Sequence, residues 1–340
     1  MIKVITFENA LDMASSNKKL HILLGNGFSR ACRNNIFAYD ALFNRANFNN
    51  LSPYIRNAFT ALSTIDFEIV MRGLRQAATI ILLYQEDNHQ LANQLRIDAD
   101  SLKEVLVSAI ADSHPEMPSD IDNQSYAACK KFLNHFQRIF TLNYDLLLYW
   151  TLMQTEIKPN IPCDDGFRKP DDGEAGYVTW EPENTYNQNI YYLHGALHIF
   201  DAGTKIQKYT WVNTGIRLIE QIRSALQSNI YPLFVAEGES RQKLERIRHS
   251  DFLSKAQRSL LNISGSMFIY GHSLADNDSH IFRLLLKSKI QQIFISIYGD
   301  PHDPSNKQVI TRANSLAHQG LSKKPLTIEF YDASSAHVWG

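Results

Sequence analysis

Apolar residues along the chain gather in short runs that end in small or polar residues. The four clearest runs are LHILLGNGFS (20–29), QRIFTLNYD (137–145), NIYYLHG (189–195) and SMFIYGHSL (266–274). Three further candidates are YPLFVA (231–236), QQIFISIYG (291–299) and LTIEFYDA (326–333). The four clearest runs are continuously apolar instead of alternating, so we expect buried strands that are covered on both faces.

Helical patterns separate these runs, and the second half of the chain alternates strand and helix. This order predicts an α/β fold with a Rossmann-like, doubly wound, mostly parallel sheet. Residues 31–134 have apolar positions at helical spacing, and Ser101 with Glu104 has the form of a capping box. We therefore expect one domain over 1–340, with a sheet core at about 20–30 and 135–333. A helical insertion at about 31–134 would follow the first strand.

Residues 155–189 contain four prolines and three glycines and predict an irregular loop. A compact domain seldom carries so long a loop without a use. Two interpretations remain open, a lid over a site and an exposed excursion.

Composition and charge exclude several function classes. Lys and Arg total 34 against 35 Asp and Glu, so no overall field attracts a polyanion. The basic stretch 241–258 is diluted by acids and favours a solvated helix face, so direct nucleic-acid binding is not expected. Cys32, Cys129 and Cys163 form no C-x-x-C pair, which argues against a disulfide framework and a structural zinc site. The chain lacks a long apolar run, so we expect a cytoplasmic protein without a membrane segment.

The chemistry is expected at the carboxyl ends of the strands, where ligands bind in parallel sheets. Gly25, Asn26, Gly27 and Ser29 follow the first strand and open a helix. Glycines there permit a tight turn and close approach to a phosphate. The third glycine of G-x-G-x-x-G is replaced by Arg30, so a purely structural turn and a nucleotide cradle both remain open.

Three further strand ends carry polar residues. Asn143 can orient a ribose hydroxyl or a water, and Asp145 can bond a hydroxyl. Either residue can instead cap the next helix, which is the favoured interpretation for Asp145. His194 ends an apolar run where Gly195 turns the chain, which suits either a core histidine or a general base.

The second histidine of that run and the last strand end add two expectations. We interpret His198 as structural, because a metal pair with His194 needs a helix that Gly195 disfavours. Gly271 and Ser273 suit a diphosphate or ribose contact, and Asp278 suits a helix N-cap. No metal site is predicted.

Taken in order, Gly-x-Gly-x-Ser, Thr-x-Asn-Tyr-Asp, Leu-His-Gly and Gly-x-Ser-Leu resemble the motifs of the sirtuin-like NAD-binding family, more narrowly its bacterial members associated with anti-phage defence. An Asp66-Phe67-Glu68 signature adds to this resemblance. The resemblance to this family implies that Asn143 positions water and the nicotinamide ribose and that His194 is the base. The cofactor would contact Gly25, Gly27, Ser29, Gly271 and Ser273.

The resemblance also has departures. Asn26 stands where sirtuins usually have Ala, no Asp-Phe-Arg follows the first motif, and the four-cysteine zinc module of deacetylases is absent. Water is then the expected acceptor, so the resemblance implies an NAD⁺ glycohydrolase that releases nicotinamide and ADP-ribose without a metal. It implies regulation by a defence partner protein or a phage-derived activator, and a homo-oligomer is possible. The alternative is a non-catalytic sensor that binds NAD⁺ or an ADP-ribose derivative and signals to a partner.

Overall fold

A computed structural model describes residues 3–15, 19–49, 51–170, 176–210, 216–228, 230–235, 240–319 and 326–340. Seven parallel strands form the central sheet, in the spatial order β1 (Val4–Ile5), β12 (Thr327–Asp332), β11 (Lys289–Ile297), β10 (Ser264–Tyr270), β2 (Leu20–Leu24), β3 (Arg138–Thr141) and β6 (Ile190–Tyr192). The predicted class, an α/β fold with a doubly wound parallel sheet, is confirmed. The run predicted as the first strand is β2, because the two-residue β1 precedes it.

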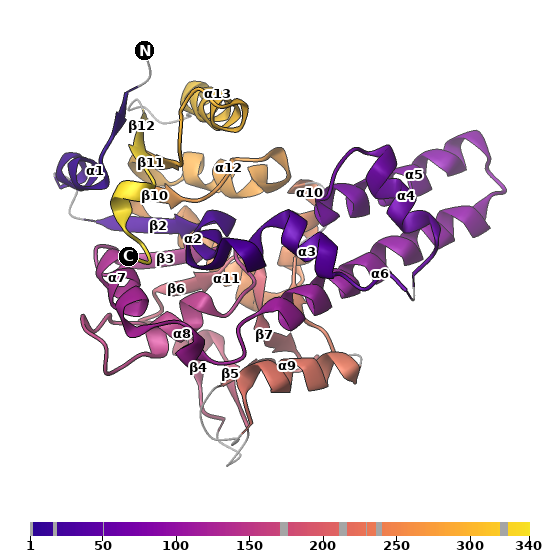
Figure 1. The fold of residues 1–340 in the computed structure, drawn as a ribbon, viewed down its shortest axis with the longest axis horizontal. Helices are drawn as coiled ribbons and strands as arrows, with labels where there is room; N and C mark the ends of the chain where they lie inside the picture. The colour runs from indigo at the N-terminus through magenta and orange to yellow at the C-terminus, as the bar shows by residue number, and fades with distance from the viewer. Residues whose placement is uncertain are drawn as a thin grey trace.

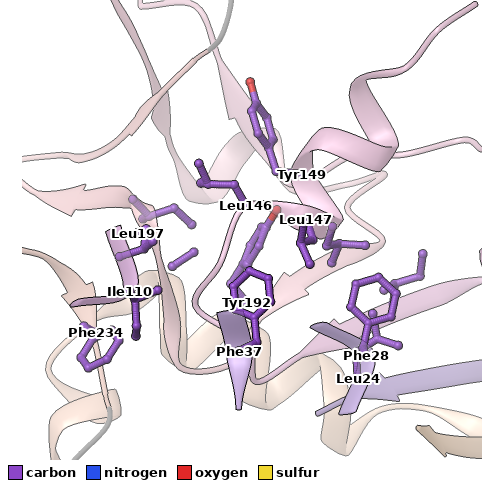
Figure 2. Packing of buried hydrophobic residues seen from close by; sticks show 14 of the residues in the cluster. Leu24, Phe28, Phe37, Ile110, Leu146, Leu147, Tyr149, Tyr192, Leu197 and Phe234 are labelled. Carbon is purple, nitrogen blue, oxygen red and sulfur yellow. The ribbon is translucent and has the colours of Figure 1, made fainter. Parts of the chain in front are cut away.

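Both faces of this sheet are buried, as the continuously apolar runs predicted. In β2, Ile22 and Leu24 belong to one hydrophobic cluster, and Leu23 belongs to the other. The helices packed into the first cluster include α1 (Phe7–Ala14), α2 (Asn26–Phe37), α7 (Asn123–Leu133) and α8 (Leu147–Met153). Those in the second are α11 (Asp251–Leu261), α12 (Ser279–Lys287) and α13 (Pro304–Gln319). Figure 2 shows part of the first cluster, including Leu24, Phe28, Phe37 and Tyr192.

The direction in which the chain adds strands reverses between β2 and β10. From β2 the chain proceeds outward to β3 and β6, then returns to β10 on the other side of β2 and continues to β11 and β12. In open parallel sheets such a reversal leaves a crevice at the carboxyl ends of the two central strands. The fold therefore places a crevice directly after β2 and β10.

The described elements between β2 and β3 are helical, in the region for which the sequence predicts a helical insertion. They are α2, α3 (Tyr39–Arg45), α4 (Tyr54–Ala61), α5 (Phe67–Tyr84), α6 (His89–Ser113), the 3₁₀ turn η1 (Pro118–Asp120) and α7. Helices α4, α5 and α6 extend away from the sheet as an arm (Figure 1). Helix α6 begins at an Asn88 cap and runs on through Ser101, so the predicted capping box at Ser101 is wrong. The apolar face from Leu102 to Ile110 is buried and continues the helix across that polar position.

A second, antiparallel sheet lies beside the first, in the order β4 (Phe167–Arg168), β5 (Tyr177–Trp180), β8 (Ile206–Tyr209), β7 (Gly195–Asp201) and β9 (Pro232–Phe234). Two of its strands come from residues 155–189, which also hold the 3₁₀ turn η2 (Pro182–Asn184). The predicted irregular loop thus contains more structure than expected, because strands of two and four residues among prolines and acids carry too little apolar pattern to detect. Residues 171–175 of that loop lie outside the described residues.

The remaining described elements are α9 (Leu218–Gln227), α10 (Ser240–Arg248), η3 (Asp276–Asp278) and η4 (Ser334–Ala336). None of the described helices combines the length and apolar character needed to span a bilayer.

Candidate functional site

The turns after β2 and β10 pack against each other without side chains between them. The backbone N–H of Gly25 donates to the Tyr270 carbonyl at 2.9 Å, and that of Gly27 donates to the Gly271 carbonyl at 2.8 Å. A Cβ on Gly27 would lie 2.4 Å from the Gly271 Cα, and Gly271 itself has φ +67°. These glycines are needed for a close approach of two backbones, which supports the structural interpretation of the turn and leaves the cradle interpretation open.

Ser29, Asn143 and Asp145 form a buried hydrogen-bonded chain. The Ser29 hydroxyl donates to the Asp145 carboxylate, and the Asn143 side-chain amide Nδ2 donates to the Ser29 oxygen at 2.9 Å. Because the side-chain nitrogen of Asn143 can only donate, Ser29 accepts from it and the Asn143 Oδ1 is left for a ligand. Asp145 also accepts from the Leu147 N–H at 2.9 Å. The N-cap of α8 is Leu146, so Asp145 contacts the start of the helix without being the predicted cap.

His194 lies between the two sheets, directly after β6 and before β7. Its side chain is 2% exposed, and its carbonyl accepts from the Val235 N–H at 3.0 Å. Gly195 has φ +83°, and a Cβ there would lie 1.8 Å from the Leu233 carbonyl oxygen. Only glycine fits this turn against β9, so Gly195 fixes the position of the histidine.

A polar cluster surrounds the His194 ring, and we call it the Asp278 cluster: His194, Lys243, His272, Asp278 and His280. The His194 and His280 Nε2 atoms are 3.2 Å apart, and His194 Nε2 is 3.8 Å from Asp278 Oδ1. Lys243 Nζ donates to Asp278 Oδ1 at 3.0 Å, and His272 Nε2 lies 3.1 Å from Asp278 Oδ2. Asp278 precedes α12 as predicted, but its side chain makes no cap hydrogen bond because these partners occupy it.

Burial sets the charge states of this cluster. Burial lowers the pKa of His194 well below its usual value, and Lys243 and His280 lower it further against the opposing effect of Asp278. Burial also lowers the pKa of His280, to about 4. Burial alone would raise the pKa of Asp278, but the His272 hydrogen bond and the Lys243 charge bring it well below the usual value. At pH 7 the cluster therefore contains two neutral imidazoles beside an ionised carboxylate.

One cavity of about 930 Å³ joins these groups, a size in the range of small-molecule sites. It is lined by eight of the nine site residues predicted from the sequence: Gly25, Asn26, Gly27, Asn143, Asp145, His194, Gly271 and Ser273. The ninth, Ser29, is fully buried and reaches the cavity through Asn143. Asn26 also donates to the Phe37 carbonyl at 3.2 Å, so its amide contributes to the fold of α2.

The family model for a domain of unknown function, DUF4917, matches residues 22–339. The chain belongs to the DUF4917 family. A search of the curated proteins found no match.

Among solved structures, this DUF4917 chain is similar to sirtuins. One is described as "The Structural basis of Sirtuin Substrate Affinity": identity 12%, TM-score 0.38, covering 93% of this chain and 100% of that one. "Structure of Sir2Tm bound to a propionylated peptide" has 13% identity and TM-score 0.38, covering 94% and 100%. "Sir2-p53 peptide-NAD+" has 14% identity and TM-score 0.36, covering 93% and 99%. This similarity is distant, and the distances and contacts of the site do not depend on it.

Several residues of the DUF4917 site were not predicted from the sequence. Lys243 lies in the stretch interpreted as a solvated helix face, yet it is 1% exposed. His272 and His280 carried no sequence signal beyond their nearness to Gly271 and Asp278. Trp339 also lines the cavity, although it lies beyond the sheet core predicted to end at about residue 333.

The sequence predicts no metal site, but the structure brings three possible metal ligands together. His194, Asp278 and His280 each offer one ligand atom, and these three atoms lie within 4.8 Å of one another. Sequence spacing could not show this, because the three residues come from two distant segments. His198, interpreted as structural, is fully buried in β7 and lies apart from this group.

Proposed function

We propose that this protein cleaves the bond between nicotinamide and ribose in NAD⁺, with water as the acceptor, to give nicotinamide and ADP-ribose. One observation carries the proposal: the two glycine turns, Asn143 and His194 line a single cavity at the ends of β2 and β10, where the order of strands reverses. Ligands of open parallel sheets bind at that place.

The residues of the cavity divide into a binding part and a reacting part. The turns at Gly25, Gly27 and Gly271 pack backbone against backbone and place the N-terminus of α2 at the cavity wall. A diphosphate can lie there, because the helix dipole favours negative charge. Ser273 adds a hydroxyl at the cavity wall. The nicotinamide ribose would then lie toward Asn143 and His194.

Cleavage builds positive charge on the ribose, and the site needs an oriented acceptor more than a covalent nucleophile. Asn143 Oδ1 can accept from a ribose hydroxyl or the attacking water, since its Nδ2 is held by Ser29. His194 Nε2 is engaged with His280, so Nδ1 is the nitrogen that would accept a proton. Water supplies the oxygen for ADP-ribose, and nicotinamide leaves with the electron pair of the broken bond.

Nicotinamide release from NAD⁺ by the purified protein tests this proposal. We expect Asn143→Ala and His194→Ala each to lower kcat by about 100-fold or more, as for loss of an acid–base group. NAD⁺ binding, measured by calorimetry, should persist. His318→Ala, an exposed change on α13, is the matched control and should match wild type. Turnover by His194→Ala at the wild-type rate would contradict its role as base.

A sensor that binds NAD⁺ or an ADP-ribose derivative without cleaving it is the second candidate. The observation that favours it is that Asn143 and His194 are both buried and both hydrogen-bonded within the protein. The same assay separates the two functions, because a sensor binds NAD⁺ and releases no nicotinamide.

A role in anti-phage defence remains a prediction from the sequence resemblance, as do a partner protein, a phage-derived activator and a homo-oligomer. We expect cellular NAD⁺ to fall after infection in cells that carry the wild-type protein and to stay constant with Asn143→Ala. Equal NAD⁺ levels in the two strains would remove the defence role without affecting the cleavage reaction.

A further inference from the structure

Three members of the Asp278 cluster could hold a metal ion, because ligand atoms of His194, Asp278 and His280 lie within 4.8 Å of one another. The Nε2 atoms of His194 and His280 are 3.2 Å apart, and His194 Nε2 is 3.8 Å from Asp278 Oδ1. Two ligands about 2.1 Å from a tetrahedral ion lie about 3.4 Å apart. Both observed separations therefore differ from that value by only a few tenths of an ångström.

We propose that His194, Asp278 and His280 bind a divalent transition-metal ion and that the bound ion inhibits the site. Two imidazoles and one carboxylate form a ligand set that suits Zn²⁺. Metal binding does not depend on the proposed cleavage of NAD⁺, whereas inhibition by the metal rests on that proposed function.

The fourth coordination position would open to the cavity. His194 and Asp278 line it, so a water or a phosphate oxygen of a bound nucleotide can complete the coordination. Catalytic zinc sites keep such an open fourth position, whereas structural zinc sites are closed.

A hydrogen bond from His272 orients the Asp278 carboxylate for an ion. The Leu274 N–H donates to His272 Nδ1 at 2.8 Å, so the His272 proton is on Nε2 and is donated to Asp278 Oδ2 at 3.1 Å. This leaves Asp278 Oδ1 toward His194. Outer hydrogen bonds of this kind commonly orient the ligands of metal sites.

Lys243 opposes the ion and makes the site weak and reversible. Its ammonium group, 1% exposed, bonds the same Asp278 Oδ1 at 3.0 Å and adds a positive charge beside the ion. Replacing this charge with an apolar side chain of similar length should therefore strengthen metal binding.

The bound ion would change the chemistry of His194 in a definite way. An ion on Nε2 of both neutral rings requires both ring protons on Nδ1, so one ring shifts its proton and none is lost overall. Nδ1 of His194 then carries a proton and cannot accept another. The ion thereby removes the base of the proposed reaction.

Co²⁺ serves as the probe, because its visible absorption reports four-coordinate binding without any need for NAD⁺. Protein freed of metal with a chelator and titrated with Co²⁺ should bind one ion per chain. His280→Gln and Asp278→Asn should abolish this binding, and exposed His318→Gln, the matched control, should retain it. Lys243→Met should lower the Kd about 10-fold or more, with circular dichroism used to verify the fold of each variant.

Two outcomes would overturn the metal site: no stoichiometric Co²⁺ binding by wild type or Lys243→Met, or binding that survives in folded His280→Gln. Nicotinamide release at increasing Zn²⁺ then tests inhibition, with half-inhibition expected near the Kd. A protein that binds Co²⁺ but never cleaves NAD⁺ contradicts the proposed function and leaves the site intact. A protein that cleaves NAD⁺ equally well when saturated with Zn²⁺ contradicts inhibition.

Discussion

At the scale of residues, the shape of the site depends mainly on glycines, which have no side chain. Gly195, Gly27 and Gly271 each stand where a Cβ would overlap backbone atoms, so small size is what brings His194 and the two turns into place. Asn143 and His194 supply the polar atoms, but their orientation comes from Ser29 and His280. A change at a residue without chemistry of its own can therefore disturb the site as much as a change at His194.

Gly195→Ala tests this at one position. The left-handed φ and the overlap with the Leu233 carbonyl should together lower the free energy of unfolding by about 2–5 kcal/mol. Gly203→Ala is the matched control, because Gly203 has φ +82° but no described atom lies within 4 Å of its Cβ position. It should cost only the conformational part, about 1–2 kcal/mol, in urea unfolding. Equal losses for both variants would show that the contact with β9 does not matter.

The site residues found by sequence were those at strand ends, where a polar group interrupts an apolar run. Asn143 and His194 have that position, and the structure brings both to the cavity. Lys243 and His280 lie on helices, where a polar residue at helical spacing is indistinguishable from a surface residue. Their burial depends on the packing of α10 against α11 and α12 and of α12 against β11, which local sequence does not specify.

At the scale of elements, the segment after β12 joins distant parts of the molecule. Trp339 is 8% exposed, its ring lies 5.1 Å from that of Phe28, and its Nε1–H donates to the Phe28 carbonyl at 2.9 Å. This short segment thus packs on α2, whose N-terminus lines the cavity.

Short elements such as the segment after β12 and strands β4 and β5 were hard to predict from the sequence. They are stabilised by tertiary contacts and have little local sequence signal.

Trp339→Ala and Trp339→Phe separate the two contributions. Loss of the ring should lower the free energy of unfolding by about 3–5 kcal/mol. Loss of the indole donor alone leaves a buried carbonyl with one hydrogen bond fewer and should cost about 1–3 kcal/mol. Chemical unfolding of both variants checks this order. An alanine variant as stable as wild type would mean that the segment is not fastened to α2.

At the scale of the whole molecule, buried histidines couple stability to pH. Burial lowers the pKa of His114 to about 4, and the same cause lowers the pKa of His21 to about 4. The unfolded chain binds these protons below about pH 6.5, whereas the folded protein does so only near pH 4. Stability is therefore complete above pH 6.5 and declines as the pH falls toward 4.

His114→Gln measures one part of that decline. His114 Nε2 accepts from the Leu146 N–H at 3.0 Å, and the glutamine oxygen can replace this acceptor. The shift from 6.5 to about 4 corresponds to about 3 kcal/mol. The free energy of unfolding of the variant should accordingly fall less than that of wild type between pH 7 and pH 4.5. Parallel pH profiles would show that His114 titrates normally in the folded protein.

The whole fold was predictable in outline because its order of strands and helices has few solutions. The parallel sheet and the convergence of strand ends followed from four apolar runs, and the switch point placed them around one crevice. The arm of α4, α5 and α6 and the second sheet were less predictable, since their placement depends on contacts between segments far apart in sequence.

The pairing of the two glycine turns also has a consequence during biosynthesis. Gly25 and Gly27 are synthesised long before their backbone partners at Tyr270 and Gly271. A growing or truncated chain that stops before β10 has neither the second turn nor Asp278. It therefore lacks a complete cavity, so the site can form only after β10 and Asp278 have left the ribosome.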